Sequence, residues 1–323
     1  MRLLIIGGTR FAGRAATETA FANGHDVTTF TRGQTNPDLF PGAEMLYGDR
    51  DGGLDVLRGR EWDAVIDTCG YYPRVVEQSV SLLRDAVPFY VFISSISAYG
   101  DLSEPPTEDS PAAELPADVT ESLDFYGPLK AECERVIQRA YGDAAAIVRP
   151  GLIVGPHDPT GRFTYWPHRI ARGGDVLAPE PKDNPVQVID ARDLGAWLVL
   201  LAERKTGGTF NAVTPPFTMH SMLETTRETL HRDARLVWVD DEFLVEREVG
   251  EWMELPLWVV GAEMAGLLRA DSSRAIAAGL TFRPLAETIR GALEQAELTD
   301  SAGMKPEREA ELLEEWASLA SGG

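Results

Sequence analysis

The first fourteen residues, Met1 to Arg14, constrain the fold of this chain more than any other stretch. They begin with a short apolar run, Leu3 to Ile6, which is typical of a strand buried on both faces of a parallel sheet. Residues 7–14 then carry three glycines, and residues 15–22 are expected to form a helix. A strand, a glycine-rich turn and a helix N-terminus together form an anion site, because backbone N–H groups point outward there and the helix dipole favours negative charge.

The glycine spacing of this turn departs from the usual three-glycine fingerprint of dinucleotide-binding folds. If Gly7 and Gly13 are the first and third glycines, Arg10 takes the middle position and places a cation beside the anion site. A lone glycine-rich turn also occurs as a plain strand-to-helix connection in α/β proteins. Because a second strand follows this turn at the expected distance, we expect it to hold a pyrophosphate. The expected contacts are Gly7, Thr9, Arg10, Phe11, Ala12 and Gly13.

Strand and helix patterns alternate along the first half of the chain. Further strands are expected at 26–30, 44–47, 63–67, 89–93 and 145–149, with helices at 75–86 and 131–141. This alternation predicts an α/β fold built on a doubly wound parallel sheet (Rossmann). We expect a dinucleotide-binding domain at 1–155, to which residues from about 186 to 215 return. Residues 156–323 are expected to form mainly a smaller C-terminal α/β substrate domain and C-terminal helices, with strands at 185–189, 208–213 and 236–239 and helices at 191–202 and 304–319.

The end of the second strand indicates which dinucleotide binds. A carboxylate there would bond the 2′-hydroxyl of the adenosine ribose, whereas this chain has Thr31 followed by Arg32. A guanidinium fits a 2′-phosphate, so the sequence favours NADP(H) over NAD, with Arg10 and Arg32 as its contacts. The alternative is that Arg32 is an ordinary solvated loop residue. Asp49, after the third strand, either meets the adenine edge or caps a helix.

Ligands of such sheets lie at the carboxyl ends of the parallel strands. The loop after the fourth strand, Thr68, Cys69 and Gly70, is therefore expected near the centre of the cofactor. Of these, Cys69 is read as a small core residue rather than a reactive thiol.

The most informative spacing in the chain joins Tyr126 to Lys130. Residues four apart on a helix share one face, so the ammonium lies near the phenol and lowers its pKa from about 10. Such a Tyr exchanges a proton with a substrate hydroxyl or carbonyl while a nicotinamide exchanges a hydride, and the Lys also bonds a ribose hydroxyl. A serine at the end of the neighbouring strand would hold the substrate oxygen. Taken alone, the spacing also fits a half-buried Tyr beside a surface Lys.

Composition limits the partners and the location of the protein. The net charge of −21 and pI near 4.6 argue against non-specific nucleic-acid binding and disfavour an anionic membrane surface. Two cysteines without a Cys-x-x-Cys pair, and histidines without a metal-ligand spacing, predict no metal site and a reduced, cytoplasmic location. The apolar run at 3–6 is too short for a signal peptide, and no stretch approaches a membrane span.

Each candidate substrate residue has two possible roles. Phe163, Tyr165 and Trp166 would line a pocket or form the core of the second domain. Arg162 and Arg192 would bind an anionic substrate or only the acidic surface around them.

Several motifs in a fixed order give the chain a family resemblance. They are the segments at 7–13 (GGTRFAG), 94–100 (SSISAYG), 126–130 (YGPLK), 149–156 (RPGLIVGP), 188–194 (VIDARDL) and 271–284. The sequence resembles extended or atypical short-chain dehydrogenases/reductases of the NAD-dependent epimerase/dehydratase group over nearly its whole length.

This resemblance implies the roles of individual residues. Ser95, Tyr126 and Lys130 would be the catalytic triad, and Tyr126 and Lys130 would also contact the cofactor. Ser94 and the backbone after Arg149, at Pro150, Gly151 and Ile153, would contact the cofactor as well, with Ser97 on the substrate side. Relatives commonly pair through a four-helix contact, so a homodimer is an open alternative.

Departures from the family pattern narrow the reaction. Sugar-nucleotide dehydratases of the family carry Asp-Glu directly after the catalytic hydroxyl, where this chain has Ile96-Ser97, and this disfavours dehydration. The sequence therefore predicts an NAD(P)-dependent reductase or epimerase acting at a carbonyl or secondary hydroxyl carbon of a small-molecule or sugar-type substrate. The alternative is a non-catalytic NAD(P)-binding regulatory or RNA-associated protein of the same fold. A broken triad or a basic face would favour this alternative.

Overall fold

Seven parallel strands form the main sheet of the protein. In this computed structural model their order is β11-β6-β5-β4-β1-β2-β3, and every neighbouring pair is parallel. The strands are β1 (Arg2–Ile6), β2 (Asp26–Thr31), β3 (Glu44–Tyr47), β4 (Ala64–Asp67), β5 (Tyr90–Ile93), β6 (Ala145–Pro150) and β11 (Gly208–Ala212). Because the order reverses on the two sides of β1, the sheet is doubly wound, which confirms the predicted fold class.

The structure describes all residues except 118, 120, 296–301 and 323, and they fall into two compact units. Unit 1 is Met1–Ile153, Val188–Pro215 and Ala270–Phe282; unit 2 is Val154–Gln187, Pro216–Arg269 and Arg283–Gly323. Sequence patterns placed a boundary at 155 and a return at about 186–215. They did not predict that 270–282 also belongs to unit 1, because this segment contributes one short helix, α8 (Ser273–Ala277), and no strand.

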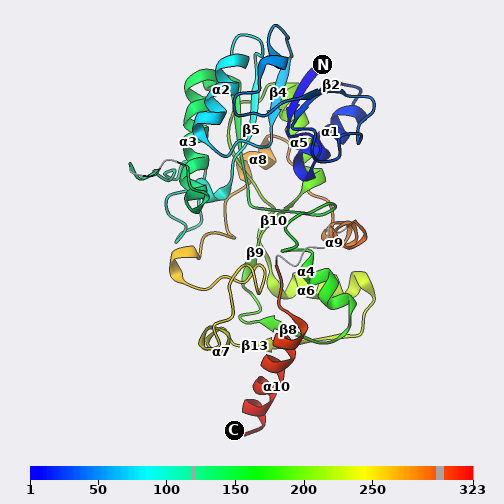
Figure 1. Cartoon of the computed structure of the whole chain (residues 1–323). Helices are drawn as coiled ribbons and strands as arrows, with labels where there is room; N and C mark the ends of the chain where they lie inside the picture. Colours follow the sequence, from blue (N-terminus) through cyan, green and yellow to red (C-terminus); the bar gives the residue numbers. More distant parts are fainter. Residues whose placement is uncertain (118, 120, 296–301, 323) are drawn as a thin grey trace. The chain divides into compact units, whose positions relative to one another are not determined.

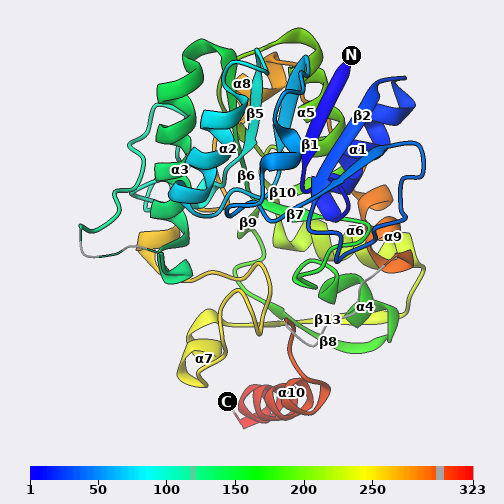
Figure 2. The same cartoon turned by 45° about the horizontal axis from the view of Figure 1, so that its top comes forward.

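Helices cover both faces of the unit 1 sheet (Figure 1). On one face lie α2 (Pro73–Leu83) and α3 (Tyr126–Tyr141), and on the other lie α1 (Phe11–Ala22) and α5 (Ala191–Arg204), as Figure 2 shows from a second direction. The strands are buried on both sides, with Leu3 and Ile5 packing toward α1 and α5 and Leu4 and Ile6 toward α2 and α3. Burial of apolar side chains on two faces is what makes each central strand a continuous hydrophobic run.

Local sequence explains where these helices begin. Helix α2 starts at Pro73, two residues before the expected start, because proline needs no N–H partner at the first helical position. Helix α5 starts after Asp190, whose side chain accepts from the Arg192 N–H and caps the helix. Helix α1 packs closely against α5 because Gly195 has no side chain; a Cβ there would lie 2.6 Å from the backbone of Ala15.

Unit 2 is built from short strands and helices. Strand β8 (Gly174–Pro179) pairs in parallel with β13 (Ala234–Val239), and β9 (Pro185–Val186) pairs antiparallel with β12 (Phe217–Thr218). Helices α4 (Tyr165–Ala171), α6 (Met219–Leu230) and α9 (Leu285–Glu294) pack together, and the unit also contains α7 (Asp241–Glu246) and α10 (Pro306–Gly322). A buried carboxylate holds α10 in place: Glu309 accepts from the Leu177 N–H at 3.0 Å and from Arg169 Nε at 2.5 Å.

The single strand expected at 185–189 is wrong. The chain forms two strands there, β9 and β10 (Val188–Asp190), which belong to different units. Another short strand, β7 (Leu152–Val154), follows β6. Apolar alternation alone did not reveal the break at Gln187, whose backbone leaves one ladder before the next begins.

Candidate functional site

The predicted cofactor and catalytic residues of unit 1 follow the carboxyl ends of its parallel strands. Gly7 follows β1, Arg32 follows β2, Asp49 lies after β3, Thr68–Gly70 follow β4, Ser94–Ser95 follow β5 and Gly151 follows β6. Since the strands are parallel, these ends lie on one edge of the sheet. The sequence-predicted residues that follow these strands therefore share one edge of the sheet.

The glycine-rich turn is shaped by close backbone contacts. Gly7 has a φ of +89°, and a Cβ on it would lie 2.6 Å from Thr68 Oγ1. A Cβ on Gly13 would lie 2.2 Å from the Gly7 carbonyl oxygen. Thr68 Oγ1 donates to the Ile6 carbonyl at 2.9 Å and so ties the ends of β1 and β4 together. Neither Gly7 nor Gly13 can therefore carry a side chain without moving the turn.

The start of α1 is left open for an anion. Arg10 is exposed and gives no side-chain cap, and the first helical turn, which lies entirely in the described part of the chain, holds no acidic residue. The next residue, Phe11, adopts a φ of +42°, an uncommon conformation for a residue with a side chain. The backbone N–H groups of this turn have no acceptor one helical turn earlier, so they are available to a ligand.

The loop after β2 folds back onto this turn. Thr9 Oγ1 donates to the Thr35 carbonyl at 2.9 Å, and Asn36 Nδ2 donates to the Thr9 carbonyl at 3.1 Å. Arg32 lies at the start of this loop, is exposed, and makes no hydrogen bond or ion pair with any described residue. Asp49 is exposed and accepts from the Asp51 N–H at 2.9 Å, so it caps a turn rather than a helix.

A missing side chain at Gly127 lets the first turn of α3 approach the segment that follows Ser95. A Cβ on Gly127 would lie 2.0 Å from the Ser97 carbonyl oxygen, so the first turn of α3 rests directly on the short 3₁₀ helix Ile96–Ala98. Ser95 precedes this helix, and its Oγ accepts from the Ser97 N–H at 3.1 Å. Both Ser95 and Tyr126 are half-buried, so their hydroxyls lie in a region that water only partly reaches.

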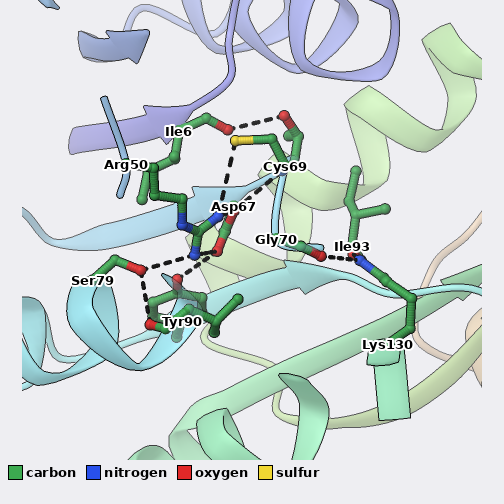
Figure 3. Close-up of polar contacts among 11 residues, drawn as sticks. Ile6, Arg50, Asp67, Cys69, Gly70, Ser79, Tyr90, Ile93 and Lys130 are labelled. Carbon is green, nitrogen blue, oxygen red and sulfur yellow. Dashed lines mark hydrogen bonds and ion pairs between the residues drawn. The ribbon is translucent and has the colours of Figure 1, made fainter. Parts of the chain in front are cut away.

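Lys130 is buried beneath the same edge. Its Nζ donates to the Gly70 carbonyl at 2.7 Å and to the Ile93 carbonyl at 2.6 Å, which links the ends of β4 and β5 (Figure 3). The Phe92 ring lies 4.3 Å from the ammonium. Burial lowers the pKa of Lys130 to about 8, so the side chain remains mostly charged at neutral pH.

The pH dependence of stability should report this burial. An unfolded lysine has a pKa of about 10.4, so between about pH 8 and pH 10 the unfolded chain binds more protons at Lys130 than the folded chain. The unfolding free energy of the wild type, measured by urea unfolding, is therefore expected to rise with pH relative to that of Lys130→Met, by up to about 1.4 kcal/mol per pH unit. The exposed Lys305→Met should show no such trend, and a flat or falling difference for Lys130→Met would contradict the interpretation.

A buried ion pair supports the loop that carries Gly70. Arg50 donates from both Nη atoms to the two oxygens of Asp67 at 2.6 Å, and from Nη2 to Ser79 Oγ at 2.8 Å. Tyr90 donates its hydroxyl to Asp67 Oδ2 at 2.6 Å (Figure 3). Burial alone would raise the pKa of Asp67, but the Arg50 guanidinium and these hydrogen bonds hold it below its usual range. Asp67 Oδ1 also accepts from the Cys69 N–H, so the ionised carboxylate shapes the turn into Gly70.

The thiol of Cys69 faces the same pair, with its Sγ 3.9 Å from Arg50 Nη1. Burial raises its pKa, so the thiol stays protonated at neutral pH. Cys69 is half-buried, and its interpretation as a small core residue rather than a reactive thiol stays a prediction.

Ser94 belongs to a second buried network. Its hydroxyl donates to Glu134 of α3, and Arg149 donates to the same carboxylate from Nε at 2.9 Å and Nη2 at 2.5 Å. The Tyr99 ring lies 4.4 Å from the Arg149 guanidinium. The Ser94 side chain is therefore bonded within the protein, and its N–H donates to the Val148 carbonyl at 2.6 Å, which leaves the Ser94 carbonyl as the group able to meet a cofactor.

The candidate substrate residues lie in different environments. Phe163 and Trp166 are fully buried within unit 2, and Trp166 Nε1 donates to the Pro256 carbonyl at 2.9 Å. Both therefore fit the core alternative, whereas Tyr165 is half-buried. In unit 1, Arg192 pairs with Asp190 at 2.8 Å, which fits the alternative that it binds a neighbouring acid. Ser97 is half-buried beside Tyr126, and its place on the substrate side stays a prediction.

Comparison with known proteins identifies the family. The family model described as the NAD dependent epimerase/dehydratase family matches residues 3–212, which is more than half of the chain. The chain belongs to this family. The match covers the glycine-rich turn, the Ser95 strand end and the Tyr126–Lys130 helix, which are three of the six segments that carry the sequence resemblance, and the segment 271–284 lies beyond it. Among curated proteins, no match was found.

Solved structures of epimerase/dehydratase relatives have the same fold. The Bordetella bronchiseptica enzyme WbmH in complex with NAD+ shares 16% identity at a TM-score of 0.67, covering 92% of this chain and 99% of that one. UDP-N-acetylglucosamine 4-epimerase from Bacillus cereus shares 18% identity at 0.66, covering 91% and 99%. The human epimerase family protein SDR39U1 with NADPH shares 22% identity at 0.61, covering 93% and 100%.

Sequence reasoning missed residues that support this family's site in the present chain. Asp67 ends an apolar strand, and a buried carboxylate needs a cationic partner. The sequence pattern did not show that Arg50 is this partner. Tyr71, directly after the predicted Gly70, was also missed; the centroid of its ring lies 6.5 Å from that of the Tyr126 ring.

Within the described residues, no helix is long and apolar enough to cross a membrane, and no group of three potential metal ligands occurs.

Proposed function

We propose that the protein is an NAD(P)-dependent oxidoreductase of the short-chain type, either a reductase or an epimerase. It would transfer a hydride at a carbonyl or secondary hydroxyl carbon of a small-molecule or sugar-type substrate. The observation that carries this proposal is that Ser95 and Lys130 lie at the sheet edge that also bears the glycine-rich turn, with Tyr126 on the helical turn that rests on Ile96–Ala98. Family membership supports it, since this family is named for NAD-dependent epimerases and dehydratases.

The chain fits a nicotinamide dinucleotide at the glycine-rich turn. Close contacts exclude side chains at Gly7 and Gly13, and the uncapped start of α1 presents backbone N–H groups to a pyrophosphate. Arg10 supplies a cation beside this site, and the loop tied to Thr9 would border the adenosine end. The bound nicotinamide ring supplies or accepts the hydride. Solved relatives named with NAD+ and with NADPH support this class of cofactor.

Each catalytic side chain has a distinct role. Tyr126 would exchange a proton with the substrate oxygen as general acid or base, and Ser95 Oγ, oriented by the Ser97 N–H, would hold that oxygen by a hydrogen bond. Lys130 would keep a positive charge near the phenol and so stabilise its phenolate. Because two carbonyls fix the Lys130 ammonium, this charge sits at a set position and needs no rearrangement during the reaction.

The preference for NADP(H) is tested by fluorescence titration of NADPH and NADH. Arg32 is exposed at the end of β2 and has no partner among the described residues, so a 2′-phosphate would meet an unengaged guanidinium. Arg32→Ala is expected to weaken NADPH binding by about tenfold, which corresponds to one charge-assisted hydrogen bond, and to leave NADH binding unchanged. Arg58→Ala, which removes an exposed arginine paired with Asp55, serves as the control.

Equal binding of NADH by the wild type and Arg32→Ala, with no preference for NADPH, would overturn the 2′-phosphate assignment. That result would favour an epimerase that retains NAD. Failure of both dinucleotides to bind would overturn the proposed function itself.

The two reactions differ in what happens to the cofactor. A reductase consumes one reduced dinucleotide for each carbonyl reduced, so NADPH absorbance falls in step with product. An epimerase returns the hydride to the opposite face of the substrate, so absorbance stays constant while the sugar inverts. Screening aldehydes, ketones and UDP-sugars with both readouts separates the two, and the UDP-sugar arm follows from the substrate named for the Bacillus cereus relative.

A further inference from the structure

Tyr71 lies against both catalytic side chains of α3. It stands in the loop after β4, directly after Gly70, whose carbonyl accepts from Lys130. The centroid of its ring lies 5.6 Å from Lys130 Nζ and 6.5 Å from the centroid of the Tyr126 ring. The residue Tyr71 is 47% exposed, whereas Lys130 is 3% exposed. An exposed ring in contact with a buried ammonium shields that ammonium from solvent.

The other sides of the ammonium are occupied. Phe92 presents its ring at 4.3 Å, and the carbonyls of Gly70 and Ile93 accept two of the three N–H groups. The titratable groups around the ammonium come from four places: Cys133 and Glu134 from α3, Asp67 from β4, Cys69 from the loop after β4 and Arg50 from the loop after β3. The Tyr71 ring also contacts the ammonium. Of these groups, Tyr71 is the one whose ring touches Lys130 and whose surface is nearly half exposed to solvent.

We propose that Tyr71 is a positioning residue of this site, whose ring keeps water from the Lys130 ammonium and holds the ring of Tyr126 in place. The proposal rests on the proposed function only in giving Lys130 and Tyr126 a catalytic role. The cover itself is a property of the folded protein and is measured without turnover.

The cover acts through hydration. A buried ammonium loses the water that would stabilise its charge, and the cation–π contacts with Phe92 and Tyr71 replace only part of it. Removing the Tyr71 ring would readmit water, so the pKa of Lys130 would rise from about 8 toward that of a free lysine. Removing only the Tyr71 hydroxyl leaves the ring in place and should change neither hydration nor pKa.

The experiment is competitive trace acetylation of the lysines across a pH series, quantified by mass spectrometry on the full chain. The sequence has only four lysines, and Lys182, Lys205 and Lys305 are exposed, so they serve as internal standards. Wild type is compared with Tyr71→Ala, Tyr71→Phe and Tyr47→Ala. Tyr47 is a matched control, because it is 48% exposed and lies at the end of β3 instead of β4.

Tyr71→Ala is expected to move the titration midpoint of Lys130 up by about one pH unit. Above that midpoint, where the amine is neutral in both proteins, the labelling of Lys130 is expected to rise because the reagent reaches the uncovered amine more readily. Tyr71→Phe and Tyr47→Ala should match the wild type, and the three exposed lysines should label alike in all four proteins. Unchanged labelling and midpoint of Lys130 in Tyr71→Ala would overturn the proposal. So would an equal change in Tyr47→Ala, since it would mean general loosening rather than removal of a cover.

A second readout concerns the reaction. Once a substrate is found, Tyr71→Ala is expected to lower kcat and to move the alkaline limb of the kcat profile to higher pH, together with the labelling midpoint. A change in KM alone would assign Tyr71 to ligand contact and overturn the positioning role. Absence of any turnover in the wild type bears on the proposed function and leaves the labelling result intact.

Discussion

Tyr126→Phe is expected to lower kcat by a factor of about 10²–10⁴, the usual contribution of a positioned general acid or base. The phenylalanine keeps the ring that contacts Tyr71 and removes only the hydroxyl that exchanges the proton. Dinucleotide binding should change little, because the glycine-rich turn and Lys130 are untouched. The measurement pairs single-turnover kinetics with NADPH fluorescence titration on the same preparations.

Tyr141→Phe provides the matched control for this substitution. Tyr141 lies at the other end of the same helix, and its buried hydroxyl has no hydrogen-bond partner among the described residues. Its ring packs against Tyr90 at a centroid distance of 5.0 Å, which phenylalanine preserves. Turnover by Tyr141→Phe should equal that of the wild type. Full activity of Tyr126→Phe under the same conditions would remove the main support for the enzyme proposal.

Asp67→Ala is expected to destabilise the protein by about 3–5 kcal/mol, because it leaves the Arg50 guanidinium buried without its counter-ion. The loss includes the hydrogen bonds from Tyr90 and the Cys69 N–H. Urea unfolding measures the change. Asp55→Ala removes an equally charged residue whose side chain is 85% exposed and paired with Arg58, so its effect should stay within about 0.5 kcal/mol.

The pH dependence of this deficit has a definite sign. The folded pKa of Asp67 lies below its unfolded value, so its carboxylate adds stability above the unfolded pKa of about 3.9. This contribution disappears as pH falls through the folded pKa. The gap between wild type and Asp67→Ala should therefore be full at neutral pH and shrink in acid. Replacing both partners, as Arg50→Met with Asp67→Leu, should recover much of the loss, and a double variant no more stable than Asp67→Ala would argue against an unpaired charge as its cause.

The sequence predicted the parallel sheet because several of its strands are short, continuous apolar runs. Leu3–Ile6, Tyr90–Ile93 and Ala145–Val148 are buried on both faces, and runs of this kind need a parallel sheet covered by helices. The location of the candidate site at one edge of the sheet could be predicted from the same pattern, since the carboxyl ends of parallel strands lie at the same edge.

The contacts within the site could not be predicted in this way. Arg50 and Asp67 are 17 residues apart, and nothing in their local sequence shows that the two side chains meet behind β4. The position of the Tyr71 ring depends on the conformation of the loop after β4. Pro73 marks where this loop ends and α2 begins, but it does not determine the direction in which Tyr71 points. The fold of unit 2 was predicted least well, because its strands are two to six residues long and β8 pairs with a strand that begins more than fifty residues later.

The discontinuity of unit 1 affects how the chain acquires its structure during synthesis. Strand β11 forms the sheet edge beside β6, and α5 covers one face of the sheet, yet both lie beyond the first long segment of unit 2. Ala275 of α8 completes the same core and leaves the ribosome later still. A nascent chain that ends near residue 155 therefore exposes an unpaired strand edge and an uncovered apolar face, both of which favour aggregation. Since non-local contacts form slowly, unit 1 is expected to complete its folding only after nearly the whole chain has emerged from the ribosome.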